Sequence, residues 1–270
     1  MPDDPAVPAL LDRRTSLLAF LGFALAGCGG GGSDDGQSAM AGTVQTRSVT
    51  ARSNGTIYPL DIYLPPGMAA IRASVPVIYL LDGDSRFSAV VDVLERTDAR
   101  AVIVGIGNEA LRNRDYVPAN TCTPSGGGQG AYLDFIRSDL IPFVETTFGG
   151  DPQRRILLGH SHGGSFVLYA LFNEVPASRL FASYLASDSS IDCMSGTVSG
   201  WESTYAAANT ALPVRLHVSY SANEAGNVTF VQQVQSHHYT GLTLVSQAYG
   251  GGHIGMIPAA FTDALTFALA

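Results

Sequence analysis

Short apolar runs alternate with segments of helical spacing along most of the chain. Runs at 75–81 and 101–106 are uninterrupted by polar residues, which is typical of strands buried on both faces of a sheet, and 181–186 is also predicted to be a strand. The pattern predicts further strands at 44–52, 55–64, 155–158, 214–220 and 242–248. Helical spacing predicts helices around Val90 to Leu94 and at 131–148, 165–172, 228–235 and 258–269.

Strands that alternate with helices form βαβ units. They therefore predict an α/β fold with a mostly parallel, doubly wound sheet and helices on both faces. The first two strands, joined by Ser53-Asn54-Gly55, are expected to form an antiparallel hairpin instead. Folds of this class carry their chemistry at the carboxyl ends of the strands. Residues 107–130 are irregular and rich in Gly and Pro, and a loop of that length is usually functional.

The N-terminal region has the features of a targeting signal. Arg13-Arg14 precede an apolar stretch that is too short to span a membrane and ends in Leu25-Ala26-Gly27-Cys28. This ending resembles a bacterial lipobox, and the paired arginines loosely resemble a twin-arginine signal. We expect a signal peptide at 1–27, a flexible Gly/Ser tether at 28–42 and the folded domain at 43–270. The domain would be exported and lipid-anchored through Cys28, facing the periplasm or the cell surface.

Composition narrows the possible chemistry. The hydrophobic fraction of 46% and charged fraction of 14% predict an ordered core, and a net charge of −8 without a basic stripe argues against nucleic-acid binding. Every basic residue is arginine. The absence of lysine excludes a Ser-Lys dyad, a lysine Schiff base and a P-loop lysine. A general base near neutral pH must therefore be a histidine or a perturbed carboxylate.

Two cysteines remain after Cys28. In an exported domain Cys122 and Cys193 would meet an oxidising compartment, and we expect them to form a disulfide. Two unpaired thiols are the alternative, because sequence does not show that the two Cα atoms are close.

The best candidate for chemistry is a serine at a strand–turn–helix junction. Residues 155–158 lead into Gly159-His160-Ser161-His162-Gly163-Gly164, a G-x-S-x-G motif before a predicted helix. Such a turn lifts the Ser161 hydroxyl above the sheet at a helix N-terminus. The free amide of His162 is then placed to stabilise an oxyanion. The alternative is a Gly-rich turn without chemistry.

His253 is the expected base. It lies in Gly250-Gly251-Gly252-His253, after the last strand, where glycines allow a loop to fold back towards Ser161. His160 and His162 flank the serine and are expected to point away from it. We read His217 as a packed strand residue and His237 and His238 as helix-end residues. Zinc at His160, His162 and His253 is an alternative, but it would not explain the glycines.

Topology also predicts the acid of the triad and the second oxyanion donor. Glu224, just past the strand 214–220, is the favoured acid, and Asp188 is the alternative. Gly83 or Asp84, after the strand 75–81, is expected to supply the second oxyanion amide. An ordinary Asp-Gly turn at this point is the alternative.

Four segments together resemble the putative-esterase family of α/β hydrolases. They are Leu80-Leu81-Asp82-Gly83, Arg112-Asn113-Arg114-Asp115-Tyr116-Val117-Pro118, Gly159 to Gly164, and Gly252-His253. This family includes siderophore trilactone esterases and relatives of esterase D and feruloyl esterases. The resemblance covers about 45–270 and implies carboxylic-ester hydrolysis without cofactor or metal.

The resemblance also implies where substrate binds. An arginine in the loop before the nucleophile holds an anionic substrate in the siderophore esterases, which points to Arg112 or Arg114, with Tyr116 beside them. An ion pair with Asp115 or a neighbour is the alternative for both arginines. The segment 187–193 departs from the family, because it lacks the aromatic residues that follow Ser-Pro-Ser in siderophore and feruloyl esterases.

The sequence thus predicts a serine esterase that forms an acyl-enzyme on a small-molecule ester. Three alternatives remain: an acyltransferase with the same triad, a non-catalytic binding lipoprotein on a hydrolase scaffold, and a peptidase.

Overall fold

A computed structural model describes residues 42–222 and 225–270. The strands are β1 (Thr43–Thr50), β2 (Ile57–Leu64), β3 (Val77–Leu81), β4 (Val102–Ile106), β5 (Arg155–His160), β6 (Ser183–Ser187), β7 (Arg215–Ser221) and β8 (Thr243–Tyr249). The helices are α1 (Met68–Ile71), α2 (Gly83–Thr97), α3 (Arg112–Tyr116), α4 (Gln129–Phe135), α5 (Ile141–Thr147), α6 (His162–Asn173), α7 (Thr197–Ala208), α8 (Ala225–Ser236), α9 (Gly252–Gly255) and α10 (Ile257–Leu269).

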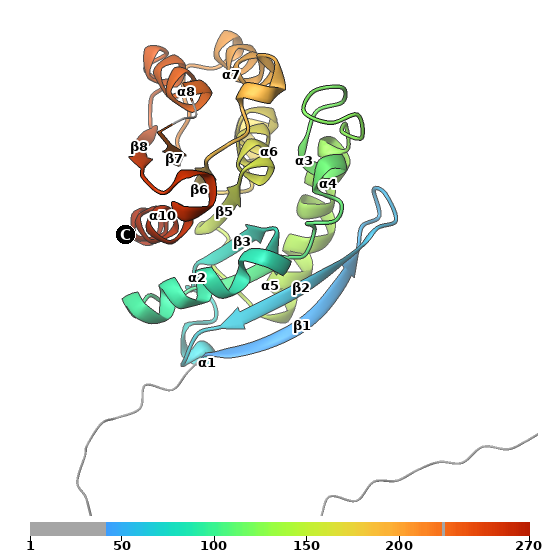
Figure 1. Cartoon of the computed structure of the whole chain (residues 1–270). Coiled ribbons are helices and arrows are strands. Elements are labelled where there is room, and N and C mark those ends of the chain that lie inside the picture. Colours follow the sequence, from blue (N-terminus) through green and yellow to red (C-terminus); the bar gives the residue numbers. More distant parts are fainter. Residues whose placement is uncertain (1–41, 223–224) are drawn as a thin grey trace, which may run out of the picture. The chain divides into compact units, whose positions relative to one another are not determined.

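All eight strands form one sheet in the order β1-β2-β4-β3-β5-β6-β7-β8 (Figure 1). β1 pairs antiparallel with β2, and β2 pairs antiparallel with β4. The other five pairings, from β4 through β8, are parallel. This arrangement confirms the predicted α/β-hydrolase architecture, including the N-terminal hairpin.

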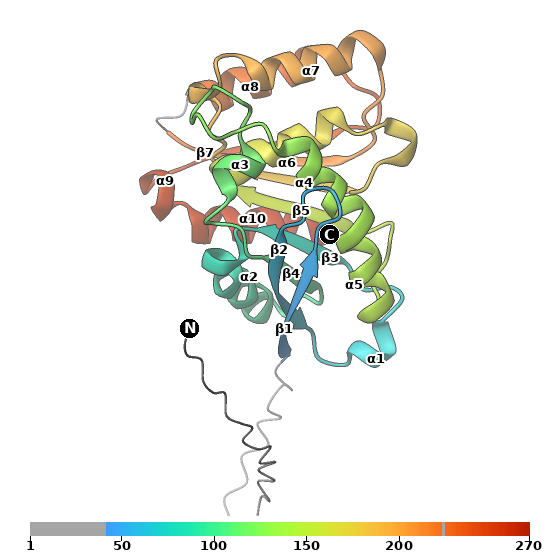
Figure 2. The same ribbon diagram turned by 90° about the vertical axis from the view of Figure 1, so that its right-hand side faces the viewer.

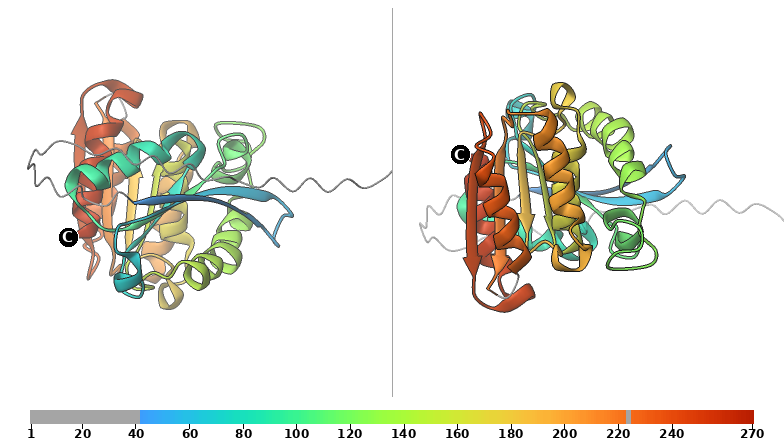
Figure 3. Two further views of the ribbon diagram at one scale, coloured as in Figure 1. Left: turned by 90° about the horizontal axis from the view of Figure 1, so that it is seen from below. Right: turned by 90° about the horizontal axis from the view of Figure 1, so that it is seen from above.

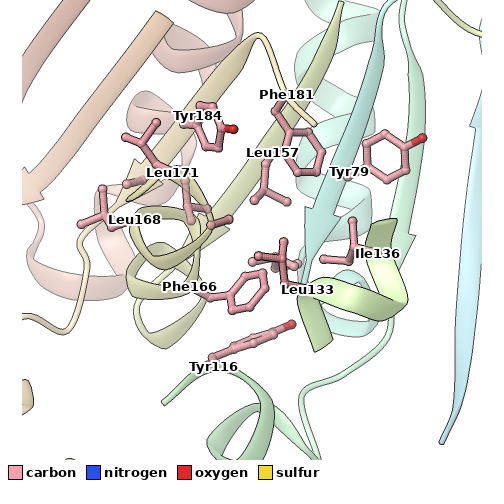
Figure 4. Close-up of a cluster of buried hydrophobic side chains, with 14 of the residues drawn as sticks. Tyr79, Tyr116, Leu133, Ile136, Leu157, Phe166, Leu168, Leu171, Phe181 and Tyr184 are labelled. Carbon is pink, nitrogen blue, oxygen red and sulfur yellow. The ribbon is translucent and has the colours of Figure 1, made fainter. Parts of the chain in front are cut away.

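Helices cover both faces of the sheet. α2 and α10 lie on one face, where they contact each other, and α6 lies on the other face with α7 packed against it (Figures 2 and 3). Each face has its own apolar core. Ile78, Val90 and Phe261 belong to the first. Figure 4 shows part of the second, in which Phe166 packs against Leu133 and Tyr116. Strands buried from both sides explain the uninterrupted apolar runs in the sequence.

The structure contains helices that the sequence pattern did not predict. α3 lies within the predicted irregular stretch 107–130, and α7 lies in a region for which the pattern predicted no element. α7 was obscured because its buried face includes Glu202 and its interior contains Gly200, which breaks the apolar periodicity. The predicted helix 131–148 is continuous but contains a π-helical turn at Ile136–Leu140.

The described residues do not test the predictions for the N-terminal region. Cys28, the signal peptide and most of the tether lie outside the described part of the chain. Within 42–222 and 225–270, no helix is both long and apolar enough to cross a bilayer.

Candidate active site

Ser161 lies at the junction between β5 and α6, in a backbone conformation that non-glycine residues rarely adopt. Its φ is 62° and its ψ is −124°. The surrounding glycines are sterically required: a Cβ on Gly159 would overlap the backbone carbonyl of Gly163, and one on Gly164 would lie 2.8 Å from the Ser187 carbonyl oxygen. Gly163, the second glycine of the motif, has more room, with 3.5 Å to its nearest neighbours. The turn therefore depends on Gly159 and Gly164.

The elbow, defined here as residues 159–164, is hydrogen-bonded to the last residue of β6 and to the loop that follows it. The Ser161 amide donates to the Ser187 carbonyl (2.9 Å), and the Ser190 amide donates to the Ser161 carbonyl (3.3 Å). The Ser161 Oγ also lies 3.3 Å from the Ser190 Oγ. Ser190 was not among the candidates from the sequence, because a serine in a loop carries no signal until the loop is placed beside the nucleophile.

His253, in α9, lies beside this elbow. Its ring packs on the ring of His160, the residue before Ser161, with 4.5 Å between centroids. Its Nδ1 lies 2.7 Å from the Asp188 Oδ2, and its side chain is 42% exposed. Because an ionised carboxylate only accepts hydrogen bonds, Nδ1 carries the hydrogen and Nε2 is left with a free lone pair. This is the arrangement that a general base requires.

Asp188 directly follows β6 and is completely buried. Its Oδ1 accepts the Ser221 amide (2.6 Å), and its own amide donates to the Ser219 carbonyl (2.6 Å), so the carboxylate is fixed by β7 while Oδ2 faces His253. The acid that contacts the imidazole is therefore the alternative from the sequence. Glu224, the favoured acid, lies outside the described residues.

Two helix N-termini offer candidate oxyanion donors at neighbouring strands. α6 begins at His162 after β5, and α2 begins at Gly83 after β3. The first amides of a helix have no intrahelical acceptor. Glycine is required at 83, since a Cβ there would overlap the backbone of Gly105 on β4. The Asp84 side chain points elsewhere: its Oδ2 accepts the Glu109 amide (3.0 Å).

The histidines beside the nucleophile are held neutral. Burial lowers the pKa of His160 to about 3 and that of His162 to about 4. His160 Nδ1 lies 3.2 Å from the Ser187 Oγ, and His162 Nδ1 lies 3.2 Å from the Asn113 Oδ1. His253 is thus the histidine that combines an accessible ring nitrogen with a carboxylate partner at this site.

The predicted substrate-binding residues Arg112, Arg114 and Tyr116 have other partners. Arg112 forms a bidentate pair with Asp82 (2.9 and 3.2 Å), and Arg114 one with Asp115 (2.7 and 3.0 Å). Tyr116 is fully buried, and its hydroxyl accepts the Asp82 amide (3.3 Å). Their placement matches the ion-pair alternative, and a side chain without exposed surface, such as Tyr116, cannot receive substrate. Sequence offered Asp115 as an ion-pair partner but did not point to Asp82, which lies 30 residues from Arg112 and 34 from Tyr116.

A disulfide joins two loops next to the elbow. Cys122 and Cys193 are bonded, with their Cα atoms 5.0 Å apart. Their sulfurs and a His162 ring nitrogen lie within 4.8 Å of one another, so the disulfide borders the elbow. Ser190, Asp192, Cys193 and His253 line a cavity of about 270 Å³. An open space bounded by the candidate base is where an ester substrate would enter.

The comparison with known families decides the assignment. The sequence model described as putative esterase matches residues 52–245. The chain belongs to this family. The esterase is 28% identical to ferri-bacillibactin esterase BesA of Bacillus subtilis (strain 168), over 83% of its own length and 89% of the relative's. It is also 35% identical to the siderophore triacetylfusarinine C esterase of Aspergillus fumigatus, over 44% of this chain and 46% of that one.

Solved structures support the same fold. An IroE-like serine hydrolase from Shewanella oneidensis superposes with a TM-score of 0.75 at 24% identity, covering 83% of this chain and 79% of the other. The likeness supports the predicted α/β-hydrolase fold, and membership of the family confirms the predicted hydrolysis of carboxylic esters.

Proposed function

We propose that the esterase is a serine hydrolase with the triad Ser161, His253 and Asp188. The observation that carries the proposal is the contact between His253 Nδ1 and Asp188 Oδ2 (2.7 Å), made by an imidazole that packs against the elbow. The buried carboxylate orients the ring and stabilises its cation, and Nε2 is left for the serine proton.

The reaction would proceed through an acyl-enzyme. His253 removes the proton of Ser161 as Oγ attacks the ester carbonyl, and the His162 amide with that of Gly83 or Asp84 holds the oxyanion. Collapse of the tetrahedral intermediate expels the alcohol, which takes its proton from His253. Water then repeats the sequence on the acyl-enzyme and releases the acid.

The resting position of the hydroxyl fits this scheme. Ser161 Oγ contacts Ser190 Oγ, and among the described residues it has no hydrogen bond to His253. Catalytic hydrogen bonds are often loose without substrate and tighten when it binds.

The proposed substrate class is a small siderophore-type ester. Support comes from the names of the relatives, which act on ferri-bacillibactin and triacetylfusarinine C. The arginines expected to hold an anionic substrate are already paired within the protein, so recognition would rely on the loops around the cavity at Ser190 and Cys193. The substrate preference is measured by comparing kcat/KM for a ferric catecholate trilactone with that for p-nitrophenyl esters of increasing chain length.

We further propose export and a lipid anchor at Cys28. The sequence supports this proposal through its charged start, short apolar run and Gly27-Cys28 ending. Mass spectrometry of membrane-extracted protein would detect the lipid on the new N-terminal cysteine, and Cys28→Ala should release the protein from the membrane fraction. Wild-type protein that remains unlipidated and soluble would refute the anchor.

The triad is tested by paired substitutions of the two neighbouring serines. Ser161→Ala should remove nucleophilic catalysis of p-nitrophenyl butyrate hydrolysis. The residual rate, which is due to the oxyanion hole and substrate binding, should be about 10³–10⁴-fold above the rate in water. Ser190→Ala removes the adjacent hydroxyl and should retain acyl-enzyme formation. Activity that survives Ser161→Ala but is lost in Ser190→Ala would reassign the nucleophile.

A further inference from the structure

The short helix α3 contacts both sides of the candidate oxyanion hole. Arg112 binds the Asp82 carboxylate through Nε (3.2 Å) and one terminal nitrogen (2.9 Å), and that same nitrogen donates to the His160 carbonyl (3.2 Å). Four residues later, Tyr116 accepts the Asp82 amide (3.3 Å). α3 thus holds Asp82 by its side chain and its backbone, and through Arg112 it also reaches the elbow.

Asp82 begins the oxyanion loop, defined here as residues 82–84. It follows β3 in the left-handed region (φ 52°) and its carbonyl accepts the Ser85 and Arg86 amides, so its orientation sets the first turn of α2. Its side chain is 5% exposed. Burial raises the pKa of the Asp82 carboxyl, and the charge of Arg112 opposes that rise. The loop therefore depends on a buried carboxylate whose cationic partner comes from α3.

The other end of the Arg112 bridge is the residue just before the nucleophile. The His160 carbonyl is part of the peptide that leads into Ser161, whose backbone is strained (φ 62°). A strained conformation persists only where surrounding contacts fix it. One guanidinium therefore contacts both the loop that carries one candidate oxyanion amide and the elbow that carries the other.

We propose that Arg112 is a positioning residue that sets the spacing of the two oxyanion donors by bracing the oxyanion loop against the elbow. The proposal rests on the proposed function, in which the amides of His162 and of Gly83 or Asp84 hold the oxyanion. It also gives a reason for the Arg112 to Tyr116 segment: two of its side chains fix Asp82, and Arg114 fixes Asp115 and the Tyr58 hydroxyl (3.0 Å).

A role in substrate binding makes a different prediction for Arg112. An arginine that recognises an anionic substrate affects KM, and only for anionic esters. A positioning arginine affects the transition state, so it lowers kcat for neutral esters as well. A neutral p-nitrophenyl ester therefore separates the two roles.

Arg155 provides a matched control at the opposite end of β5. It also pairs with a carboxylate, Glu145 (2.6 Å), and donates to a backbone carbonyl, that of Leu180 (3.2 Å). Its side chain is 15% exposed, compared with 23% for Arg112. Arg155→Met thus removes one carboxylate contact and one carbonyl contact, as Arg112→Met does, but at the end of β5 that is remote from Ser161.

The experiment compares Arg112→Met, Arg112→Lys and Arg155→Met on neutral p-nitrophenyl butyrate. Loss of one oxyanion donor costs about 10²–10³-fold in kcat, so misplacement of a donor in Arg112→Met should cost about 10- to 100-fold, with KM nearly unchanged. Arg112→Lys retains the charge and guards against failure to fold; it should fall between wild type and Arg112→Met. Arg155→Met should retain kcat within about twofold. Urea unfolding of each variant checks that the folded fraction is the same.

The proposal is overturned if folded Arg112→Met and Arg112→Lys hydrolyse the neutral ester with a kcat within twofold of that of Arg155→Met, which is the result expected of an arginine that only binds anionic substrate. Failure of the proposed function would look different. If Ser161→Ala kept its activity, the triad itself would be wrong whatever the arginine variants did.

Discussion

Two buried aspartates follow parallel strands of the sheet, and both have a positive φ. Asp82 follows β3 with φ 52°, and Asp188 follows β6 with φ 42°. Each is buried, and each holds a side chain from another part of the chain, Arg112 or His253. The partners differ in one respect: imidazole exchanges a proton near neutral pH and guanidinium does not.

A buried aspartate after a parallel strand thus holds a different kind of partner at each of the two places. At Asp188 it orients the candidate base, His253, whose side chain is 42% exposed. At Asp82 it fixes a cation that is 23% exposed and contacts the elbow. Asp82 gives both oxygens to Arg112, whereas Asp188 gives one oxygen to His253 and the other to the Ser221 amide, so the two carboxylates hold their partners differently. The following experiments break each part in turn.

Removal of the carboxylate at Asp188 should have the largest effect. Asp188→Asn keeps the shape but lets the amide donate to Nδ1, which favours the wrong tautomer. We expect kcat to fall about 10⁴-fold with KM little changed, measured by steady-state kinetics. Glu224→Gln is the matched comparison. A large loss in Glu224→Gln with none in Asp188→Asn would return the acid to Glu224.

Next in size is the covalent link between the two parts of the site. Cys122 lies in the segment after α3, Cys193 in the segment after Asp188, and the bond closes a loop of 71 residues. Its removal in Cys122→Ser/Cys193→Ser should lower the free energy of unfolding by about 2–4 kcal/mol, measured by urea denaturation. Two titratable thiols in the unreduced, unfolded wild type would show that the bond is absent.

Asp82→Asn weakens the second pair without removing its shape. Arg112 would keep an acceptor but lose the ionic contribution, so we expect kcat on a neutral ester to fall about tenfold, on the scale of one charge-assisted hydrogen bond. The pH dependence of kcat should be unchanged, because Asp82 does not contact His253. A shifted pH profile would place Asp82 in the acid–base part of the site and break the comparison.

The last prediction concerns stability alone and a buried histidine outside both pairs, whose removal leaves the active site unchanged. Burial lowers the pKa of His217 from 6.5 to about 4. His217 of the unfolded chain binds a proton below pH 6.5, whereas His217 of the folded chain stays neutral down to about pH 4. The neutral ring therefore costs no stability above pH 6.5, and the free energy of unfolding falls as the pH drops from 6.5 to 4. His217→Phe should remove a slope of up to about 1.4 kcal/mol per pH unit, measured by urea unfolding between pH 7 and 5. Equal slopes in both proteins would contradict the burial of an uncharged ring.

The sequence predicted the sheet, the hairpin and the elbow, because the apolar runs and the glycines around Ser161 follow local rules. It also placed the candidate base after the last strand. It favoured Glu224 as the acid because topology shows only which strand end is available, whereas the contact with His253 depends on the path of the loop that contains Asp188. It did not foresee the Asp82–Arg112 pair, since no local pattern joins residues 30 positions apart.

Covalent labelling tests the central claim, that Ser161 is the nucleophile, most directly. The intact protein is treated with a fluorophosphonate and digested, and the modified residue is located by mass spectrometry. The proposed triad predicts a single adduct on Ser161, slower labelling in Asp188→Asn and none in Ser161→Ala. An adduct on Ser190, or labelling that survives Ser161→Ala, would contradict it.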